Sequence, residues 1–135
     1  MLYTLRRVKQ VSPNVTGMFY LNVLLAFPFY ALSGQLRQEN ALLIDANTKQ
    51  PVVLRNDESM PDVFVADWGN SRARTIFLDS VRSMLASGYV DGLFADKWGA
   101  SCKRLNETHW SICNNMCGTV TEQQALAYNS GAAQV

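Results

Sequence analysis

The chain lacks an excess of charge of either sign, and it lacks a long apolar run. Its 12 Lys and Arg residues nearly balance its 11 Asp and Glu residues, which leaves a formal net charge of +1. The basic residues are scattered, so they form no stripe of the kind that binds nucleic acid. The longest apolar run, residues 23–32, is interrupted by Pro28 and is too short to cross a bilayer. We therefore expect no nucleic-acid partner and no membrane span.

Histidine and the common cofactor-binding motifs are also scarce. His109 is the only histidine, so the chain offers no second imidazole for a metal site. The spacing of Cys113 and Cys117 resembles a zinc motif only loosely. The sequence contains no glycine-rich phosphate loop, no dinucleotide-binding fingerprint and no Ser-His-Asp set. We expect neither a cofactor nor a metal.

The few cysteines all lie in one late segment, as Cys102, Cys113 and Cys117. Either Cys102 forms a disulfide with one of the other two, which leaves one cysteine over, or all are ordinary free thiols. Two glycosylation sequons, at residues 14–16 and 106–108, together with the cysteines favour an extracellular setting. Residues 1–7 lack the basic-then-apolar order of a secretion signal, so a leader would lie outside this chain. The sequence leaves the oligomeric state open.

What is present describes one ordinary globular domain. Of the 135 residues, 48% are hydrophobic and 17% are charged, which suffices for a real core. The order of predicted elements is helix, strand, hairpin, strand, helix, strand, loop and helix. Their ranges are 2–11, 15–22, 42–54 (within an insert over 36–58, placed above the sheet), 63–66, 71–88, 90–95, 97–120 (the Cys-containing loop), and from 121 onward.

This order of elements predicts the α/β class with a parallel sheet. A helical pattern separates the strands at 63–66 and 90–95, so we expect those two strands to be parallel neighbours. Three such strands cannot close a barrel, which needs about eight. We therefore interpret residues 1–135 as a single segment of a larger (β/α)8 TIM barrel, with about three parallel strands and a β-hairpin insert.

The two strands share a design in which a short apolar run ends in an aspartate. The first reads VFVADW and ends at Asp67, and the second reads YVDGLFADKW and ends at Asp96. Working groups in barrel enzymes lie where the parallel strands end. We therefore expect Asp67 and Asp96 to lie close together at one edge of the sheet. Asp91 lies at the opposite end of its strand, and we interpret it as structural.

Several segments in a fixed order resemble a known family. They are MFYLN at 18–22, the hairpin ending in Pro51 and Val52, DWGN at 67–70, and VDGLFAD at 90–96. Over about residues 15–99 the chain resembles the glycoside-hydrolase-like (β/α)8 barrel proteins, and more distantly the barrel polygalactosaminidases and amylase-type glycosidases. The resemblance implies hydrolysis of a polysaccharide or oligosaccharide. It also implies that Asp96, which closes the Asp-Gly-x-x-x-Asp element, is the nucleophile or base.

Glycoside hydrolysis requires two carboxyl groups, one ionised and one protonated. We expect Asp67 to be the partner acid or an acceptor for a sugar hydroxyl, or alternatively to cap the helix that follows it. A like-charged neighbour would raise the pKa of one of the pair, as an acid catalyst requires. The alternative for Asp96 is a cap on the next loop or an ion pair with Lys97. A second possibility is that the acid lies beyond Val135.

Five further residues are candidate substrate-binding groups because of their position beside the two acids: Asn22, Tyr20, Trp68, Trp98 and Lys97. Aromatic faces stack on the apolar surfaces of sugar rings. Tyr20 and the two tryptophans can instead simply pack in the core. Besides the glycosidase, we keep two alternatives, a non-catalytic carbohydrate-binding relative and an inactive truncated fragment.

Overall fold

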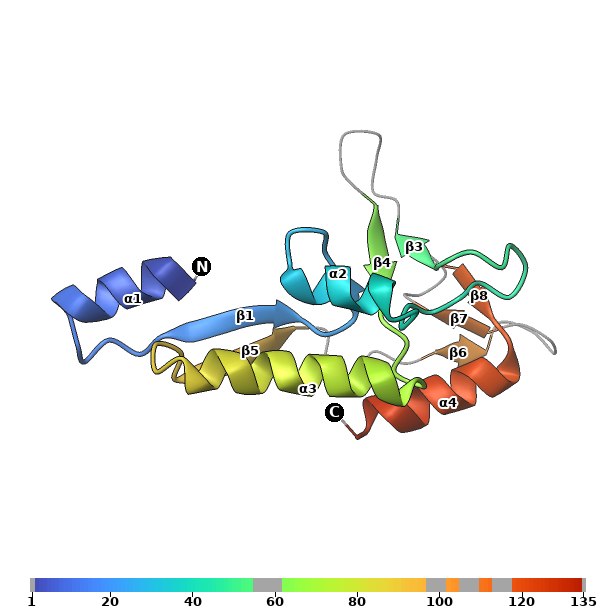
Figure 1. The fold of residues 1–135 in the computed structure, drawn as a ribbon. Coiled ribbons are helices and arrows are strands. Elements are labelled where there is room, and N and C mark those ends of the chain that lie inside the picture. Colours follow the sequence, from blue (N-terminus) through green and yellow to red (C-terminus); the bar gives the residue numbers. More distant parts are fainter. Residues whose placement is uncertain (1, 55–61, 97–101, 105–109, 113–117, 135) are drawn as a thin grey trace.

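The computed structural model describes residues 2–54, 62–96, 102–104, 110–112 and 118–134. They form a mixed α/β arrangement of helices and short strands (Figure 1). In chain order the elements are α1 (Leu2–Val11), β1 (Met18–Asn22), β2 (Leu25–Ala26), α2 (Ala31–Gln38), β3 (Val53–Leu54), β4 (Val63–Val65), α3 (Ser71–Ala86), β5 (Gly92–Asp96), β6 (Lys103–Arg104), β7 (Trp110–Ile112), β8 (Gly118–Val120) and α4 (Glu122–Ala132).

Local signals in the sequence set the helix ends. The side chain of Asn70 accepts a hydrogen bond from the backbone N–H of Arg72 at the start of α3, which satisfies a donor that the helix leaves unpaired. Gly88 follows the end of α3 with a φ of +74°, a conformation that glycine adopts without strain. Thr121 and Gln124 form a capping box at the start of α4. The predictions for α1, α3 and α4 are confirmed.

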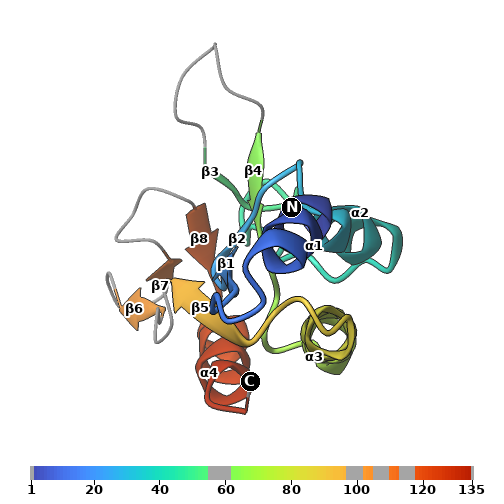
Figure 2. The same ribbon diagram turned by 90° about the vertical axis from the view of Figure 1, so that its left-hand side faces the viewer.

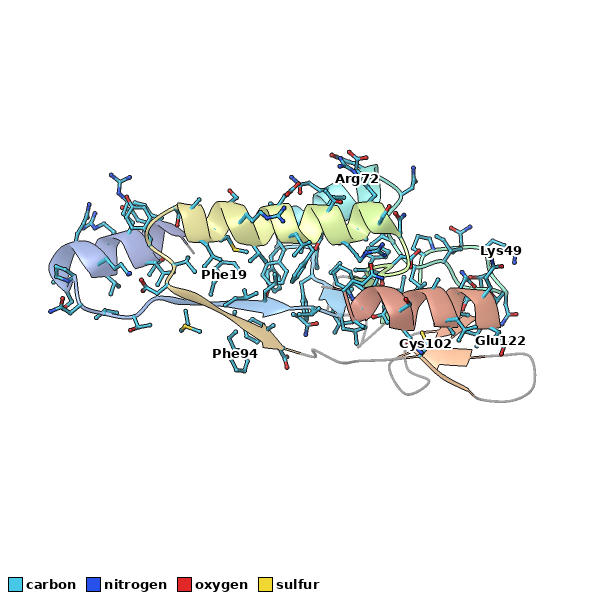
Figure 3. All side chains as sticks on the ribbon, turned by 90° about the horizontal axis from the view of Figure 1, so that it is seen from below. Phe19, Lys49, Arg72, Phe94, Cys102 and Glu122 are labelled. Atoms are coloured by element: carbon cyan, nitrogen blue, oxygen red, sulfur yellow. The ribbon has the colours of Figure 1, made fainter. Side chains whose placement is uncertain are left out.

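A parallel pair of strands forms one part of the sheet structure. β1 pairs with β5 in the register Met18 with Gly92 through Asn22 with Asp96. α3 precedes β5 and covers one face of this pair, where Phe19 and Leu21 are buried. Figure 3 shows Phe19 on the α3 side and Phe94 on the opposite side. Seen along the pair in Figure 2, α3 lies on one side and β6 and β7 lie on the other.

The expected pairing of the strands at 63–66 and 90–95 is wrong. β4 is the central strand of an antiparallel sheet with the order β2-β4-β3, and it is not hydrogen-bonded to β5. A short apolar run suits a buried central strand in either kind of sheet, so the run itself does not select the partner. One partner of β4 is β3 of the hairpin just before it in the chain, as is common for sequential elements. The other partner is β2, which follows β1.

The predicted hairpin therefore forms part of this sheet and does not lie above it. Ile44 faces Pro51 in an isolated antiparallel bridge, as a hairpin over 42–54 requires. Leu42 bridges Ala66, and β3 pairs with β4. Leu42, Leu43 and Val52 are consequently buried. The apolar residues that indicated two hairpin strands also supply part of the core.

The predicted Cys-containing loop over 97–120 includes three short strands, β6, β7 and β8, in one antiparallel sheet. Cys102 is a buried free thiol, so neither of the two disulfides considered for it is formed. Cys113, Cys117 and His109 lie outside the described residues.

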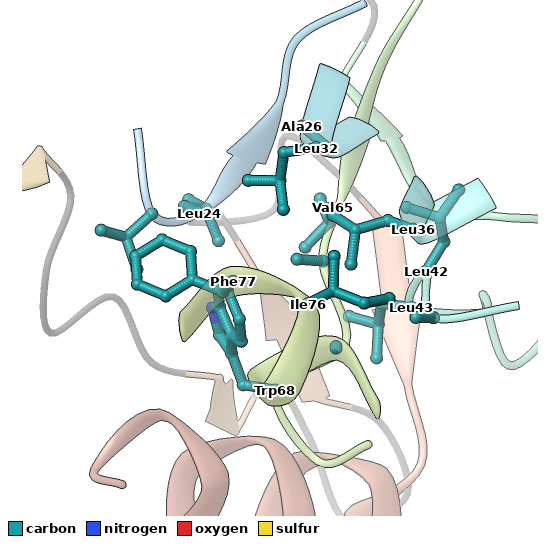
Figure 4. Packing of buried hydrophobic residues seen from close by; sticks show 14 of the residues in the cluster. Leu24, Ala26, Leu32, Leu36, Leu42, Leu43, Val65, Trp68, Ile76 and Phe77 are labelled. Atoms are coloured by element: carbon teal, nitrogen blue, oxygen red, sulfur yellow. The ribbon is translucent and has the colours of Figure 1, made fainter. Parts of the chain in front are cut away.

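The main core lies between α2, α3 and the antiparallel sheet (Figure 4). Ile76 and Phe77 of α3 pack there with Leu36 of α2 and Val65 of β4. Burial of each such side chain contributes about 1.5–3 kcal/mol. None of the helices in the described ranges is long and apolar enough to cross a membrane.

Candidate functional site

Asp96 lies at the carboxyl end of β5, beside the end of β1. Its carboxylate oxygen Oδ2 accepts a hydrogen bond from the Tyr20 hydroxyl at 2.6 Å. Tyr20 is paired with Phe94, and Asp96 lies two residues beyond Phe94 in β5. Because alternate residues of a strand point to the same face, the side chains of Tyr20 and Asp96 lie on one face of the β1–β5 pair. The hydrogen bond to Asp96 raises the pKa of Tyr20. The Tyr20 hydroxyl therefore stays protonated and donates to Asp96.

Phe94 is a member of this site that sequence reasoning missed. Its ring stacks on the ring of Tyr20, with centroids 5.9 Å apart and planes inclined by 22°. Phe94 is two residues from Asp96 and directly opposite Tyr20 in the register. The two-residue alternation of a strand was the signal that could have found it, since it puts positions 92, 94 and 96 on one face.

Asn22 supports the site by shaping the backbone. Its side chain is only 5% exposed, and its oxygen Oδ1 accepts hydrogen bonds from the N–H groups of Leu24 (3.0 Å) and Leu25 (2.7 Å). This Asx-type turn carries the chain from β1 into β2. The amide oxygen proposed for substrate binding is thus engaged with the backbone.

Asp67 follows β4 in a more enclosed setting. Its oxygen Oδ1 accepts a hydrogen bond from the N–H of Gly69 at 3.0 Å, and its carbonyl oxygen accepts one from the N–H of Asn70. Burial raises the pKa of Asp67, although these two N–H groups and the charge of Arg74 act in the opposite direction. The Asp67 carboxyl group therefore stabilises the turn before α3, whereas the cap of α3 itself is Asn70. Burial shifts the Asp67 carboxyl toward its protonated form.

The two acids flank one short stretch of backbone. The N–H of Val23 donates to the carbonyl of Asp96 at 2.9 Å, and the N–H of Ala66 donates to the carbonyl of Leu24 at 3.4 Å. The ends of β4 and β5 thus both reach the 22–24 segment. Burial is the largest cause of the raised pKa of Asp67. The expected like-charge effect of Asp96 on that pKa stays a prediction.

The remaining candidates fall into two groups. Trp68 is 2% exposed, and its ring packs edge-on against Phe77 with centroids 5.3 Å apart. Its indole thus has the core position that was the alternative to sugar stacking. Lys97 and Trp98 lie outside the described residues.

Asp91 accepts hydrogen bonds from Lys9 and from the N–H of Gly17, each at 2.6 Å, which confirms the structural role expected for it.

Two hollows among the described residues are relevant here, and neither is lined by both acids. A pocket of about 240 Å³ is lined by Asp67, Gly69, Asn70, Gln123, Gln124 and Ala127. A larger one of about 810 Å³ lies between α1, β1, α2 and α3, with Phe19, Tyr30 and Met84 among its lining. The larger hollow is mainly apolar and contains neither candidate acid. The smaller one, where a carboxyl group meets amide side chains, is the better place for chemistry on a polar substrate.

Two buried ionisable groups lie behind Asp67. Burial, followed by the charge of Asp67, raises the pKa of the Cys102 thiol to about 12. Burial also raises the pKa of Tyr128, whose hydroxyl has no hydrogen-bond partner among the described residues. A thiol with so high a pKa is a poor nucleophile. Cys102 therefore contributes packing and a low-polarity surrounding rather than covalent chemistry.

Within the described ranges, no three His, Cys, Asp or Glu side chains converge in a way that could hold a metal ion.

Comparison with known proteins adds no relative. The sequence matches no protein-family profile, and no curated protein matches it.

Proposed function

We propose that this chain hydrolyses glycosidic bonds, with Asp67 as the general acid and Asp96 as the ionised base or nucleophile. The observation that carries the proposal is the contrast between their surroundings. Burial raises the pKa of Asp67 and favours its protonated form. Asp96 accepts a hydrogen bond from the Tyr20 hydroxyl, which stabilises an ionised carboxylate. Such a pair of unlike carboxyl groups is what glycoside hydrolysis uses.

The proposed reaction assigns one proton movement to each acid. Asp67 donates its proton to the glycosidic oxygen as the bond from that oxygen to the anomeric carbon breaks. Asp96 removes a proton from the water that attacks the anomeric carbon, or attacks that carbon itself before water releases the sugar. Tyr20 holds the Asp96 carboxylate through its hydroxyl hydrogen bond. The substrate in this proposal is a polysaccharide or oligosaccharide.

We also propose that β1, α3 and β5 correspond to one unit of a (β/α)8 barrel. Support comes from the parallel pairing of β1 with β5 and from the position of α3 on one face of that pair. The antiparallel sheet β2-β4-β3 departs from the barrel pattern. The proposal is therefore limited to that unit.

Conservative variants of the two acids test the activity. Asp67→Asn and Asp96→Asn keep the side-chain size, and each should lower the rate of reducing-sugar release from soluble glycans by about a hundredfold or more. Asp79→Asn is the matched control, because the Asp79 carboxylate is exposed and forms an ion pair with Arg82 of the same helix. Equal rates in all three variants would contradict the proposal.

Carbohydrate binding without hydrolysis is the second candidate function. It is favoured by the lining of the smaller pocket, which includes Asp67 but not Asp96, because hydrolysis requires both acids at one bond. In this case glycans bind to the wild-type chain, and no reducing sugar is released. Binding and turnover measured on the same sample separate the two functions.

A further inference from the structure

We infer that the smaller pocket binds a single neutral sugar unit, and that Gln123 of α4 is the side chain that recognises the sugar hydroxyls there. The inference rests on the proposed function for its carbohydrate substrate, and it adds the class of sugar and a residue for that same site. One wall of the pocket is the turn between β4 and α3, and the other is the first two turns of α4. α4 lies beside the start of α3 (Figure 1). The lining residues are Asp67, Gly69, Asn70, Gln123, Gln124 and Ala127.

Three amide side chains line this pocket, and they differ in what already occupies them. The Asn70 oxygen caps α3. The Gln124 oxygen accepts a hydrogen bond from the N–H of Thr121, and its nitrogen donates to the carbonyl of Ile44. The Gln123 side chain is exposed and has no hydrogen-bond partner among the described residues. Of the three, Gln123 alone can therefore turn both its oxygen and its NH₂ group toward the hydroxyls of a ligand.

The size of the pocket limits the length of glycan that it can hold. Its volume is about 240 Å³, whereas sites for drug-sized ligands have roughly 300–1,000 Å³. The two walls approach closely at Gly69, where a Cβ would lie 3.0 Å from the Cβ of Ala127 and 3.1 Å from Oδ1 of Asp67. The pocket therefore suits one sugar ring, and the rest of a longer glycan would lie outside it.

The charges around the pocket favour a neutral sugar over an acidic one. Among the residues that the structure describes, the lining contains the carboxyl group of Asp67 and no Lys, Arg or His. Glu122, next to Gln123 at the start of α4, adds a second carboxyl group nearby. Arg74 donates to the carbonyl of Trp68 and is not part of the lining. An ionised uronic acid would therefore bring a like charge to these carboxyl groups with no cation in the lining to offset it.

The test is a titration of the isotope-labelled 135-residue chain, followed by nuclear magnetic resonance, with methyl β-D-glucopyranoside, methyl β-D-galactopyranoside and N-acetyl-D-glucosamine. We expect at least one of these sugars to shift the side-chain amide signals of Gln123. Gln123→Ala should weaken its binding about fivefold, as the loss of one hydrogen-bonding side chain does, and α4 should persist because alanine favours helices. Gln38→Ala is the matched control, because Gln38 is an exposed glutamine of α2 outside the pocket. It should leave the dissociation constant unchanged.

A second variant and a charged probe complete the test. Ala127→Leu puts a larger side chain into the pocket from an exposed helix position, so it should abolish binding while the circular dichroism spectrum stays that of the wild type. Glucuronic acid should bind at least about tenfold more weakly than the neutral sugar, because like charges repel. The inference is overturned if no neutral sugar shifts the Gln123 signals, if Gln123→Ala binds like the wild type, or if glucuronic acid binds as tightly as the neutral sugar.

Failure of this inference can be told apart from failure of the proposed hydrolysis. If Asp67→Asn abolishes the release of reducing sugar while no neutral sugar shifts the Gln123 signals, the sugar pocket is wrong and the hydrolysis stands. If a neutral sugar binds, Gln123→Ala weakens that binding and no glycan is hydrolysed, the hydrolysis is wrong and the sugar pocket stands.

Discussion

Asp67 and Asp96 each close a short apolar strand, yet they occupy very different surroundings. Asp67 lies at the packed end of the molecule, where β4 is the centre of a sheet and α4 crosses the Trp68–Gly69 backbone. Asp96 lies on the open face of β1 and β5, beside two exposed aromatic rings. Burial by neighbouring elements, rather than the strand that carries the acid, is what raises the pKa of Asp67.

The largest expected effect is a difference in the free energy of unfolding between variants on the two faces of the β1–β5 pair. Leu21→Ala, on the covered face where Leu21 is 2% exposed, should lower the free energy of unfolding by about 2–5 kcal/mol, because it leaves a cavity. Phe94→Ala, on the open face, should lower it by less than about 1 kcal/mol. Urea denaturation followed by circular dichroism measures both. Equal losses would mean that the open face is covered in solution.

A glycine at the packed end tests how closely α4 approaches. A Cβ on Gly131 would collide with the carbonyl group of Trp68, so Gly131→Ala should destabilise the fold by about 1–3 kcal/mol. Gly34 in α2 is the control, since a Cβ there meets nothing within 4 Å. Gly34→Ala should be neutral or stabilising by about 0.5–1 kcal/mol. A harmless Gly131→Ala would show that α4 does not pack directly on this backbone.

The hairpin is tied to the packed end by Asp45, which gives a pH-dependent prediction. Its carboxylate accepts hydrogen bonds from the N–H groups of Asn47, Thr48 and Thr119, each at 2.9 Å. Burial opposes ionisation, but these bonds prevail and lower the pKa of Asp45 to about 2. The stabilisation is therefore present above the unfolded pKa of about 3.9 and is lost as the pH falls toward the folded value.

Removal of that charge should have a modest effect, since Asp45 is partly exposed. Asp45→Asn should lower the free energy of unfolding by about 1 kcal/mol near neutral pH, after allowance for solvent screening. The difference from wild type should disappear near the folded pKa of about 2. Thermal unfolding over a pH series measures it. A difference that persists unchanged in acid would mean that hydrogen-bond geometry, rather than charge, is what Asp45 supplies.

The smallest expected effect is the contribution of Asp67 to the pH dependence of stability, and its sign is opposite to that of Asp45. Because burial raises its folded pKa, the folded state holds the proton more tightly than the unfolded state. Stability from this group is present below the unfolded pKa and is lost as the pH rises through the folded pKa. Asp67→Asn keeps an acceptor for Gly69 and should be more stable than wild type at neutral pH. The same pH series would contradict this if wild type gained stability over the variant as the pH rose.

Local features were predictable because neighbouring residues set them. The caps at Asn70 and Thr121 and the left-handed Gly88 act within one helical turn, and the structure has all three. The bridge between Ile44 and Pro51 likewise followed from a turn between two apolar runs. For the site, the Tyr20–Asp96 contact follows from parallel pairing, but Phe94 and the burial of Trp68 depend on which faces other elements cover.

The amino-acid sequence alone determined where α1, α3 and α4 begin and end, that helices and strands are mixed, and that an aspartate follows each of two apolar strands. Those properties depend on hydrogen bonds and side-chain spacing within a few residues. Tertiary structure decided that β4 joins the hairpin and that β5 joins β1. It also decided that Asp67 is enclosed while Asp96 borders an open aromatic face. Pairing between distant segments depends on competition among many similar apolar runs. A run of three or four apolar residues therefore does not determine which strand it pairs with.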